Sequence, residues 1–361
     1  MKKILIASYS LGFGGIETSL INLLKNFDLK KYKVTLVLEK KEGVYLNDVP
    51  KEVEIKEYKV STSNNFVIRK IKNLINRIKW IIKNYNKYDA SISYATYSGP
   101  CGFVARTASK NKILFVHNDY YQIYLKDERQ TKEFFDKLKI CKYNHVVFVS
   151  NESRESIEKL YPVIKAKTIN NLIDHKKILD LSKEIEVEKK ENKKTFLFVG
   201  RLDEHQKRVS RIIEVANKFK DKKNLEFWIL GDGEQRPTYE KMIKKYKLKN
   251  IKLLGAKKNP YPYIKVCDAI LLTSDYEGFP VVYNEAIILN KPIITTINVS
   301  DESINIQDGF GMLCNKDVKS ICQAILKFIN ENHNNSKRLD FKKLNKKRID
   351  MIMELLEEEN G

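Results

Sequence analysis

Cysteine is scarce in this 361-residue sequence, and its pattern excludes two kinds of site. The five cysteines are an odd number, and they lack the close paired spacing of zinc and redox motifs. We interpret them as buried free thiols rather than as a disulfide framework. This usage is typical of a reducing compartment, so we expect a cytoplasmic protein. The cysteines are Cys101, Cys141, Cys267, Cys314 and Cys322.

Long apolar runs are also missing. No stretch of about 18 apolar residues occurs, so no segment is expected to span a bilayer. The first residues, MKKILIASYS, place two lysines before an apolar stretch, but that stretch ends at Ala7 and is too short for a signal peptide. We therefore expect any membrane contact to be peripheral, on the inner face of the cell membrane.

Acidic residues are outnumbered, with 46 Asp and Glu against 67 Lys and Arg and a net charge of +21. Such a balance favours acidic partners, including phosphorylated substrates, anionic lipid and nucleic acid. Lysine, asparagine and isoleucine recur along the whole chain, so the alternative explanation for part of the excess is codon bias in an AT-rich genome. The basic residues gather on no nucleic-acid module, so we expect no nucleic-acid partner, and nucleic-acid binding is the weaker alternative.

The length predicts two domains, each large enough to bury its own core. In the first, an apolar run at 2–7 leads through Gly12, Gly14 and Gly15 into a helix over 16–27. Further runs alternate with helical patterns, which predicts an α/β domain with a largely parallel sheet. These expected strands are 34–39, 53–58, 90–95, 112–117 and 145–150.

The same pattern starts again in the second half of the chain. We expect one domain over 1–170 and another over 171–361, with a last helix at about 336–361 packing back on the first. Residues 171–194 are predicted to be a charged helical connection. The expected fold class is α/β, with two Rossmann-like domains whose parallel sheets face a central cleft. Strands of the second domain are expected at 195–199, 225–230, 251–254, 268–273, 292–296 and 311–314.

The first glycine loop matches only part of a dinucleotide-binding fingerprint. Gly12 and Gly14 fit its first two glycines, and Glu39 ends the second strand. Glu17 stands where the third glycine belongs, and its carboxylate would repel a pyrophosphate. A nicotinamide or flavin site is therefore disfavoured.

The most informative segment lies at 268–296, where an apolar strand leads into a loop and then a helix. Pro280 marks the start of that helix. Backbone N–H groups and the macrodipole favour an anion at such a helix start. Glu277 precedes the helix and Glu285 lies within it, so two hydroxyl-binding carboxylates flank an anion site. A nucleotide-sugar matches this arrangement; the alternative is two glutamates with no shared task.

A second segment, FLFVGRLDEHQKRVSRIIEVA, supplies cations. Arg201 directly follows a strand and Lys207 comes just before a helix. The carboxyl ends of strands are where open α/β sheets bind ligands, and two cations there would neutralise a pyrophosphate. We interpret Arg208 and Arg211 as charges on the helix surface.

The stretch from Arg201 to Thr296 resembles the donor domain of glycosyltransferase family 4, also called group 1, whose members are retaining enzymes of the GT-B fold. The resemblance rests on GRL with a downstream lysine, the GDG turn at 231–233, the strand that starts at Asp268, and two glutamates separated by seven residues. The loop GGIE at 14–17 is similar to that family's first loop. Two departures are Arg208, where many relatives have glycine, and Asn284, where an aliphatic residue is usual.

The resemblance implies a role for each matching residue. Arg201 and Lys207 would hold the pyrophosphate, Glu277 would meet the sugar and Glu285 the ribose. His117 resembles a histidine beside the transferred sugar, although an isolated histidine is more often structural. The implied catalytic residues are His117, Glu277, Arg201 and Lys207, and backbone contacts to the donor are implied for Gly14, Gly15, Gly278, Phe279 and Pro280.

The implied function is transfer of a sugar, with retention of its anomeric configuration, from a UDP-sugar to a hydroxyl of a glycan or lipid-linked acceptor in bacterial polysaccharide synthesis. Residues 1–170 would take the acceptor and 171–361 the donor. No two aspartates are separated by one residue, so the Asp-x-Asp metal cradle of the other large glycosyltransferase fold is missing, and we expect neither metal nor other cofactor. The alternative is a non-catalytic or epimerase-type nucleotide-sugar-binding protein of the same fold.

A helix is predicted over 66–85, with an apolar face that we expect to be core. The apolar face comprises Val67, Ile71, Leu74, Ile75, Ile78, Ile81, Ile82 and Tyr85. On the opposite side lie Arg69, Asn73, Asn76, Trp80 and Lys83. Two interpretations of Trp80 remain open: it docks in a membrane interface among cations that meet anionic lipid, or it packs under a neighbouring part of the protein.

Overall fold

The computed structural model describes the chain except for residues 13, 298–304, 308, 332–337 and 359–361. The chain divides into two compact units, the first formed by Met1–Ile173 with Lys342–Gly361 and the second by Asp174–Phe341. The sequence-based boundary fell between residues 170 and 171. Of the last helix expected at 336–361, residues 336, 337 and 359–361 lie outside the described residues.

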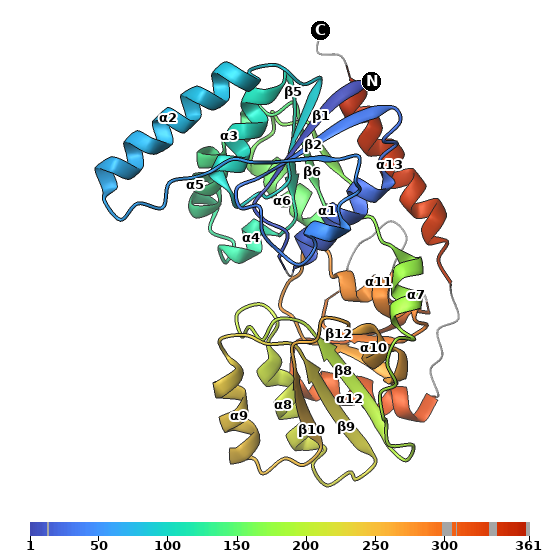
Figure 1. The fold of residues 1–361 in the computed structure, drawn as a ribbon. Coiled ribbons are helices and arrows are strands. Elements are labelled where there is room, and N and C mark those ends of the chain that lie inside the picture. The colour runs from blue at the N-terminus through green and yellow to red at the C-terminus, as the bar shows by residue number, and fades with distance from the viewer. Residues whose placement is uncertain (13, 298–304, 308, 332–337, 359–361) are drawn as a thin grey trace. The chain divides into compact units, whose positions relative to one another are not determined.

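The first unit is built on a seven-stranded parallel sheet in the order β3-β2-β1-β4-β5-β6-β7 (Figure 1). All strands expected in this half are present, and the three-residue β7 is an addition that has no apolar run. The strands are β1 Lys2–Ser8, β2 Tyr32–Leu38, β3 Glu54–Glu57, β4 Ala90–Ser93, β5 Asn111–Val116, β6 His145–Phe148 and β7 Ala166–Thr168.

Helices cover both faces of this sheet, so both sets of alternating strand side chains are apolar. Ile4 and Ile6 of β1 pack on one face, with residues of α1 and α13, whereas Leu5 and Ala7 point to the other. The helices are α1 Gly15–Asn26, α2 Phe66–Asn84, α3 Gly99–Ala108, α4 Tyr120–Ile123, α5 Glu128–Leu138, α6 Asn151–Leu160 and α13 Phe341–Glu357. Short 3-10 turns occur at Leu46–Asp48 and Ile140–Lys142.

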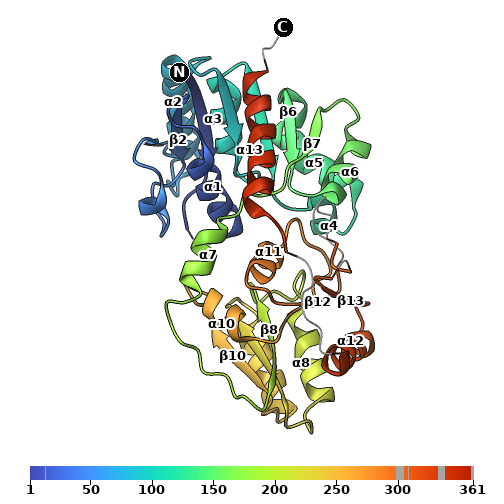
Figure 2. The ribbon, with the colours of Figure 1, turned by 90° about the vertical axis from the view of Figure 1, so that its right-hand side faces the viewer.

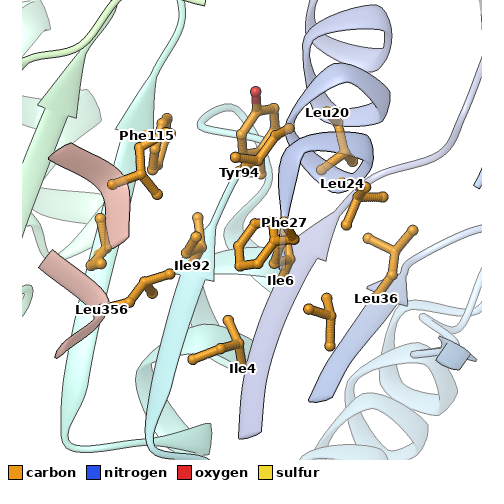
Figure 3. Packing of buried hydrophobic residues seen from close by; sticks show 14 of the residues in the cluster. Ile4, Ile6, Leu20, Leu24, Phe27, Leu36, Ile92, Tyr94, Phe115 and Leu356 are labelled. Carbon is orange, nitrogen blue, oxygen red and sulfur yellow. The ribbon is translucent and has the colours of Figure 1, made fainter. Parts of the chain in front are cut away.

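Helix α13 lies along the strands of the first unit although it comes last in the chain (Figure 2). Leu355 and Leu356 are buried in the same core cluster as Ile4 and Ile92 (Figure 3). The Asn345 side chain accepts a hydrogen bond from the Ile173 amide at 3.0 Å and donates one to the Ile173 carbonyl at 2.7 Å. The end of the chain is thus fixed to the first unit by apolar packing and by backbone hydrogen bonds.

The second unit has a six-stranded parallel sheet in the order β10-β9-β8-β11-β12-β13, and all six expected strands are confirmed. Phe196 of β8 contacts Phe328 of α12 on one face, and Trp228 of β9 lies near Tyr263 of α10 on the other. The strands are β8 Lys194–Val199, β9 Leu225–Leu230, β10 Ile251–Gly255, β11 Ala269–Leu272, β12 Ile293–Thr295 and β13 Gly311–Leu313. The helices are α7 His175–Leu181, α8 Val209–Lys218, α9 Arg236–Lys245, α10 Tyr261–Val266, α11 Val281–Ile288 and α12 Val318–Glu331. Two parallel-sheet α/β units confirm the predicted fold class.

Three local expectations are wrong. Only α7 of the connection expected at 171–194 is helical; it belongs to the second unit and contacts α10 and α11. Cys141 is exposed, and burial is complete only for Cys101 and Cys267. The third error concerns the orientation of α2.

Helix α2 packs against the rest of the first unit through its polar side, which we had expected to face outward. Trp80 is 9% exposed, its indole donates to the Thr107 hydroxyl at 3.1 Å, and its ring meets that of Tyr58. Asn73 and Asn76 lie on the same side, whereas the apolar face is exposed. The expectation that the apolar face is buried was wrong because Asn73 and Asn76 form hydrogen bonds with the backbone of a neighbouring loop. These bonds let the polar side of the helix pack against the protein. Of the two interpretations of Trp80, packing within the protein holds.

Across the described part of the chain, no helix has both the length and the apolar character that crossing a membrane requires.

Candidate active site

The candidate site of the second unit lies where the strand order of its sheet reverses. From β8 the chain proceeds outward to β9 and β10, whereas β11 lies on the other side of β8 and leads to β12 and β13. The loops after β8 and β11 therefore leave in opposite directions, and ligands bind at such switch points in open α/β sheets. Arg201 and Lys207 follow β8, and Glu277 follows β11.

Close backbone contact explains two of the glycines in this region. Gly231 has φ +149°, and a Cβ there would stand 1.8 Å from the Gly200 carbonyl oxygen. A Cβ at Gly233 would lie 2.5 Å from the Leu202 carbonyl oxygen, and the Leu202 amide donates to the Asp232 carbonyl at 3.0 Å. The GDG turn thus fixes the path of the GRL loop.

Asp268, also part of the family pattern, has a structural role at the start of β11. Its carboxylate accepts from the Thr195 amide at 2.7 Å and pairs with the Lys189 ammonium at 2.6 Å. These contacts join β11 to β8 and lie at the opposite end of the strands from the candidate site.

At the centre of the site is an ion pair between Lys207 and Glu277. The Lys207 ammonium lies 2.5 Å from Oε1 of Glu277, with side-chain exposures of 17% and 7%. The same oxygen accepts from the Ser274 hydroxyl at 2.7 Å, and Oε2 accepts from the Gln206 amide group at 3.1 Å. A carboxylate that accepts from three donors is fixed in position. Sequence reasoning missed Ser274 and Gln206, although both stand in the two loops it had identified.

Arg208 and Arg211 form a second ion-pair cluster, which their interpretation as charges on the helix surface did not include. The Asp275 carboxylate is bound by Arg208 at 2.5 Å and by Arg211 at 2.7 Å, and these hydrogen bonds keep the pKa of Asp275 below its ordinary value despite burial. Arg208 has φ +52°, a conformation that glycine adopts more readily. This accounts for the departure noted in the sequence: Arg208 lies where many relatives have glycine, and ion pairing to the loop after β11 stabilises it there.

Arg201 is more exposed than Lys207, Arg208 and Arg211. Its guanidinium has 67% side-chain exposure and is 3.6 Å from the Asp203 carboxylate. An exposed pair of this length is worth about 0–1 kcal/mol, so Arg201 can turn to an incoming anion at little energetic cost.

Helix α11 begins directly after the glutamate of the central ion pair. Gly278, Phe279 and Pro280 are buried, and Pro280 is the N-cap. The first amides of an α-helix have no acceptor within the helix, and the macrodipole makes this end partly positive. The helix start that favours an anion thus lies only a few residues after Glu277 in the chain, and Glu277 forms an ion pair with Lys207.

Glu285 lies inside α11 and is partly buried. Burial raises its pKa to about 7, against the smaller opposite effect of a hydrogen bond from Tyr261. The neighbouring Asn284 is 1% exposed, and neither its amide oxygen nor its nitrogen has a partner among the described residues. Near neutral pH the Glu285 side chain exists in both protonation states, so it can donate to or accept from a hydroxyl.

Glu285 should make the stability of the second unit depend on pH. Its folded pKa of about 7 exceeds the ordinary 4.5, so the folded state keeps a proton that the unfolded state has lost, and stability falls as pH rises between these values. Glu285→Gln should equal the wild type near pH 4 and exceed it by about 3 kcal/mol at pH 8. Thermal unfolding of both proteins at both pH values measures this. Parallel pH profiles for the two proteins would contradict the assignment.

Two further predicted residues, Gly14 and Gly15, lie in the first unit at the start of α1. Gly14 is the N-cap and both glycines are exposed. A Cβ on Gly14 would stand 2.1 Å from a carboxylate oxygen of Glu17. Burial raises the pKa of Glu17, with a backbone hydrogen bond opposing it. The Glu17 side chain thus folds back over Gly14, and a larger residue at position 14 would displace that carboxylate.

His117 follows β5 in the same unit and is buried. Its ring lies 4.4 Å from that of Tyr94, and no described residue makes a hydrogen bond of normal geometry to either ring nitrogen. Burial lowers the pKa of His117 to about 3, with a smaller opposing effect from the Tyr94 backbone. The imidazole is therefore neutral at physiological pH, and a buried unpaired nitrogen indicates a missing partner.

The site residues fall into two groups. The structure brings Lys207 and Glu277 into contact and places Arg201, Gly278, Phe279, Pro280 and Glu285 in the same unit, whereas Gly14, Gly15 and His117 belong to the other. Within the described residues, no group of three or more His, Cys, Asp or Glu side chains is arranged to hold a metal ion.

Known families and relatives match both units. Residues 182–348 match the profile described as Glycosyl transferases group 1, and residues 13–177 match Glycosyltransferase Family 4. An uncharacterized glycosyltransferase of Methanocaldococcus jannaschii is 32% identical over 163 residues, which are 43% of this chain and 40% of that protein. The N-acetylgalactosamine-N,N'-diacetylbacillosaminyl-diphospho-undecaprenol 4-alpha-N-acetylgalactosaminyltransferase of Campylobacter jejuni is 24% identical over 88% of this chain and 87% of its own length.

A solved structure agrees in fold over nearly the whole chain. The Anabaena protein HepE, crystallised with UDP and glucose, superposes with a TM-score of 0.73 at 16% identity and covers 98% of this chain and 100% of its own. Together with the two profile matches and the two parallel-sheet units, this fold shows that the chain belongs to the group 1 glycosyltransferases and has the GT-B fold.

Proposed function

We propose that this protein is a retaining glycosyltransferase that moves a sugar from a UDP-sugar to a hydroxyl of a glycan or lipid-linked acceptor in polysaccharide or glycolipid synthesis. The observation that carries the proposal is the partly buried Lys207–Glu277 ion pair at the switch point of the second sheet, where Glu277 directly precedes the loop that starts α11. Cations and helix amides there suit a diphosphate, and the carboxylates of Glu277 and Glu285 suit hydroxyls on either side.

Each residue has one task in this proposal. Arg201 and Lys207 bind the diphosphate and stabilise the charge that develops as it departs. Glu277, held by Ser274 and Gln206, orients the sugar, and Glu285 binds the ribose. His117 is neutral and can hydrogen-bond a sugar hydroxyl without adding charge.

Retention follows the family resemblance. The bond between the anomeric carbon and the diphosphate oxygen breaks while the acceptor oxygen bonds to the same face of that carbon. The acceptor proton passes to the departing phosphate oxygen, so neither a protein base nor an oxidant is needed.

Two comparisons support the choice of substrates. HepE was crystallised with UDP, which supports a uridine donor. The Campylobacter jejuni relative is named for transfer to a diphospho-undecaprenol-linked sugar, which supports a lipid-linked acceptor. A cytoplasmic location is part of the proposal, because UDP-sugars are made there.

The proposal is tested by incubating the full chain with a panel of UDP-sugars and undecaprenyl-diphosphate-linked sugars. We expect acceptor-dependent release of UDP and a product with the donor's anomeric configuration by NMR. An epimerase would convert the sugar without releasing UDP, and a non-catalytic protein would bind without turnover. Either outcome, or an inverted product, would overturn the assignment.

We further predict that excess chelator leaves this activity unchanged. The sequence has no Asp-x-Asp cradle, and Arg201 and Lys207 supply the positive charge that a cation supplies elsewhere. The rate is measured with and without chelator, then after addition of magnesium or manganese. Loss of activity followed by rescue with either metal would refute metal independence.

A further inference from the structure

The apolar face of helix α2 is exposed on the surface of the first unit. Ile82 is 81% exposed, Val67 61% and Leu74 59%, and the face continues through Ile71, Ile75, Ile78, Ile81 and Tyr85. Ile68 extends it at the N-terminal end. A contiguous apolar surface of this length marks an interaction site, because isolated exposed apolar residues are common but an aligned set is not.

The orientation of α2 is fixed by specific contacts on its other side. Asn76 donates to the Lys59 carbonyl at 3.0 Å, the Ser61 amide donates to Asn73 at 2.7 Å, and Trp80 is held by Thr107 and Tyr58. The Asn65 side chain caps the helix by accepting from the amides of residues 67 and 68. Rotating the helix to bury its apolar face would break the contacts of Asn73, Asn76 and Trp80, so the exposed face is a property of the folded unit.

Cations border the exposed face on both sides, and residues 66–85 contain no aspartate or glutamate. At 3.6 residues per turn, Lys72 and Lys79 follow one edge of the apolar face. Lys70 and Arg77 follow the other edge. The surface is therefore an apolar strip between two positive borders.

We propose that this surface, the α2 face, docks the protein on a bilayer that contains anionic lipid. A helix with a wide apolar face, a cationic border and low net hydrophobicity lies in the plane of the membrane interface, where apolar side chains enter the acyl boundary and lysines meet headgroups. Tyr85 suits the headgroup level. Trp80 takes no part, because it is buried against the protein.

Charge distinguishes the bilayer from other partners. A second copy of this chain would bring like-charged borders together across a symmetric interface. A nucleic acid would satisfy the lysines but leave the apolar strip in water. The inference goes beyond the proposed function, since reaction with a water-soluble acceptor does not need it.

The test is flotation of the full chain with phosphatidylcholine vesicles that contain about one-third phosphatidylglycerol, and with pure phosphatidylcholine. Wild-type protein should float with the anionic vesicles at low salt and float less at high salt. Ile71→Ser/Ile78→Ser/Ile82→Ser should lower the partition coefficient about tenfold or more. All three side chains are exposed, so the melting temperature should not change.

Matched variants separate the α2 face from general effects. Val163→Ser removes an equally exposed apolar side chain elsewhere in the first unit and should bind like the wild type, as should Trp80→Phe on the packed side. Lys72→Gln/Lys79→Gln should lower binding about tenfold, whereas the same change at the exposed Lys220 and Lys222 should not.

Two results would overturn the proposal. Wild-type protein that stays with the soluble fraction at low salt in the presence of anionic vesicles excludes lipid docking. A dimer in sedimentation velocity that the triple serine variant converts to a monomer, without vesicle binding, assigns the face to self-association instead.

Discussion

Replacing Lys207 with alanine should lower kcat/KM for sugar transfer about a thousandfold. The change removes a cation from the diphosphate and leaves Glu277, whose side chain is 7% exposed, without its ammonium partner. Initial rates over a range of donor concentrations separate the effects on kcat and KM. A loss below tenfold would contradict the role given to this lysine.

Two controls make this result specific. Lys241→Ala removes an exposed lysine from α9 and should leave kcat/KM unchanged. In a double-mutant cycle, Lys207→Ala/Glu277→Gln should lose less than the sum of the single losses, because the two side chains act as a pair.

The two glutamates should respond differently to the same ligands. Glu285→Ala should weaken binding of free UDP about tenfold, because the ribose loses its partner. Glu277→Gln should spare free UDP or bind it more tightly, since it removes a carboxylate that neutralises Lys207 in the structure, yet it should lower kcat about a hundredfold. Calorimetry with UDP and turnover with the full donor measure both effects. Equal losses for both ligands in both variants would refute the division of roles.

The strands were predictable because buried parallel strands are short continuous apolar runs. Residues 225–230 and 195–199, for example, match β9 and the core of β8. The connection at 171–194 was not predictable from charge: helical propensity without partners to pack against does not sustain a helix beyond Leu181.

The orientation of α2 shows the limit of pattern arguments. Amphipathic periodicity identified the helix correctly, with bounds of Phe66–Asn84. It could not show which face packs, because Asn73 and Asn76 form hydrogen bonds with a loop whose position depends on the fold. An apolar stripe predicts burial, but not whether protein or another partner provides it.

The charged residues of the candidate site could be predicted from the sequence, but the neutral residues that hydrogen-bond to them could not. Arg201, Lys207, Glu277 and Glu285 stood out because each has a charge that an anion or a hydroxyl can use. Ser274 and Gln206 are neutral and ordinary in loops, and only the geometry shows them on Glu277. Their signal in the sequence was position alone: Ser274 lies two residues after β11, and Gln206 directly precedes Lys207.

The central claim is that the switch point of the second unit binds the donor diphosphate, and a crystal structure of the full chain with UDP tests it most directly. The account predicts the diphosphate beside Arg201, Lys207 and the first turn of α11, with the ribose hydroxyls on Glu285. UDP bound with its diphosphate away from all three of these groups would contradict it.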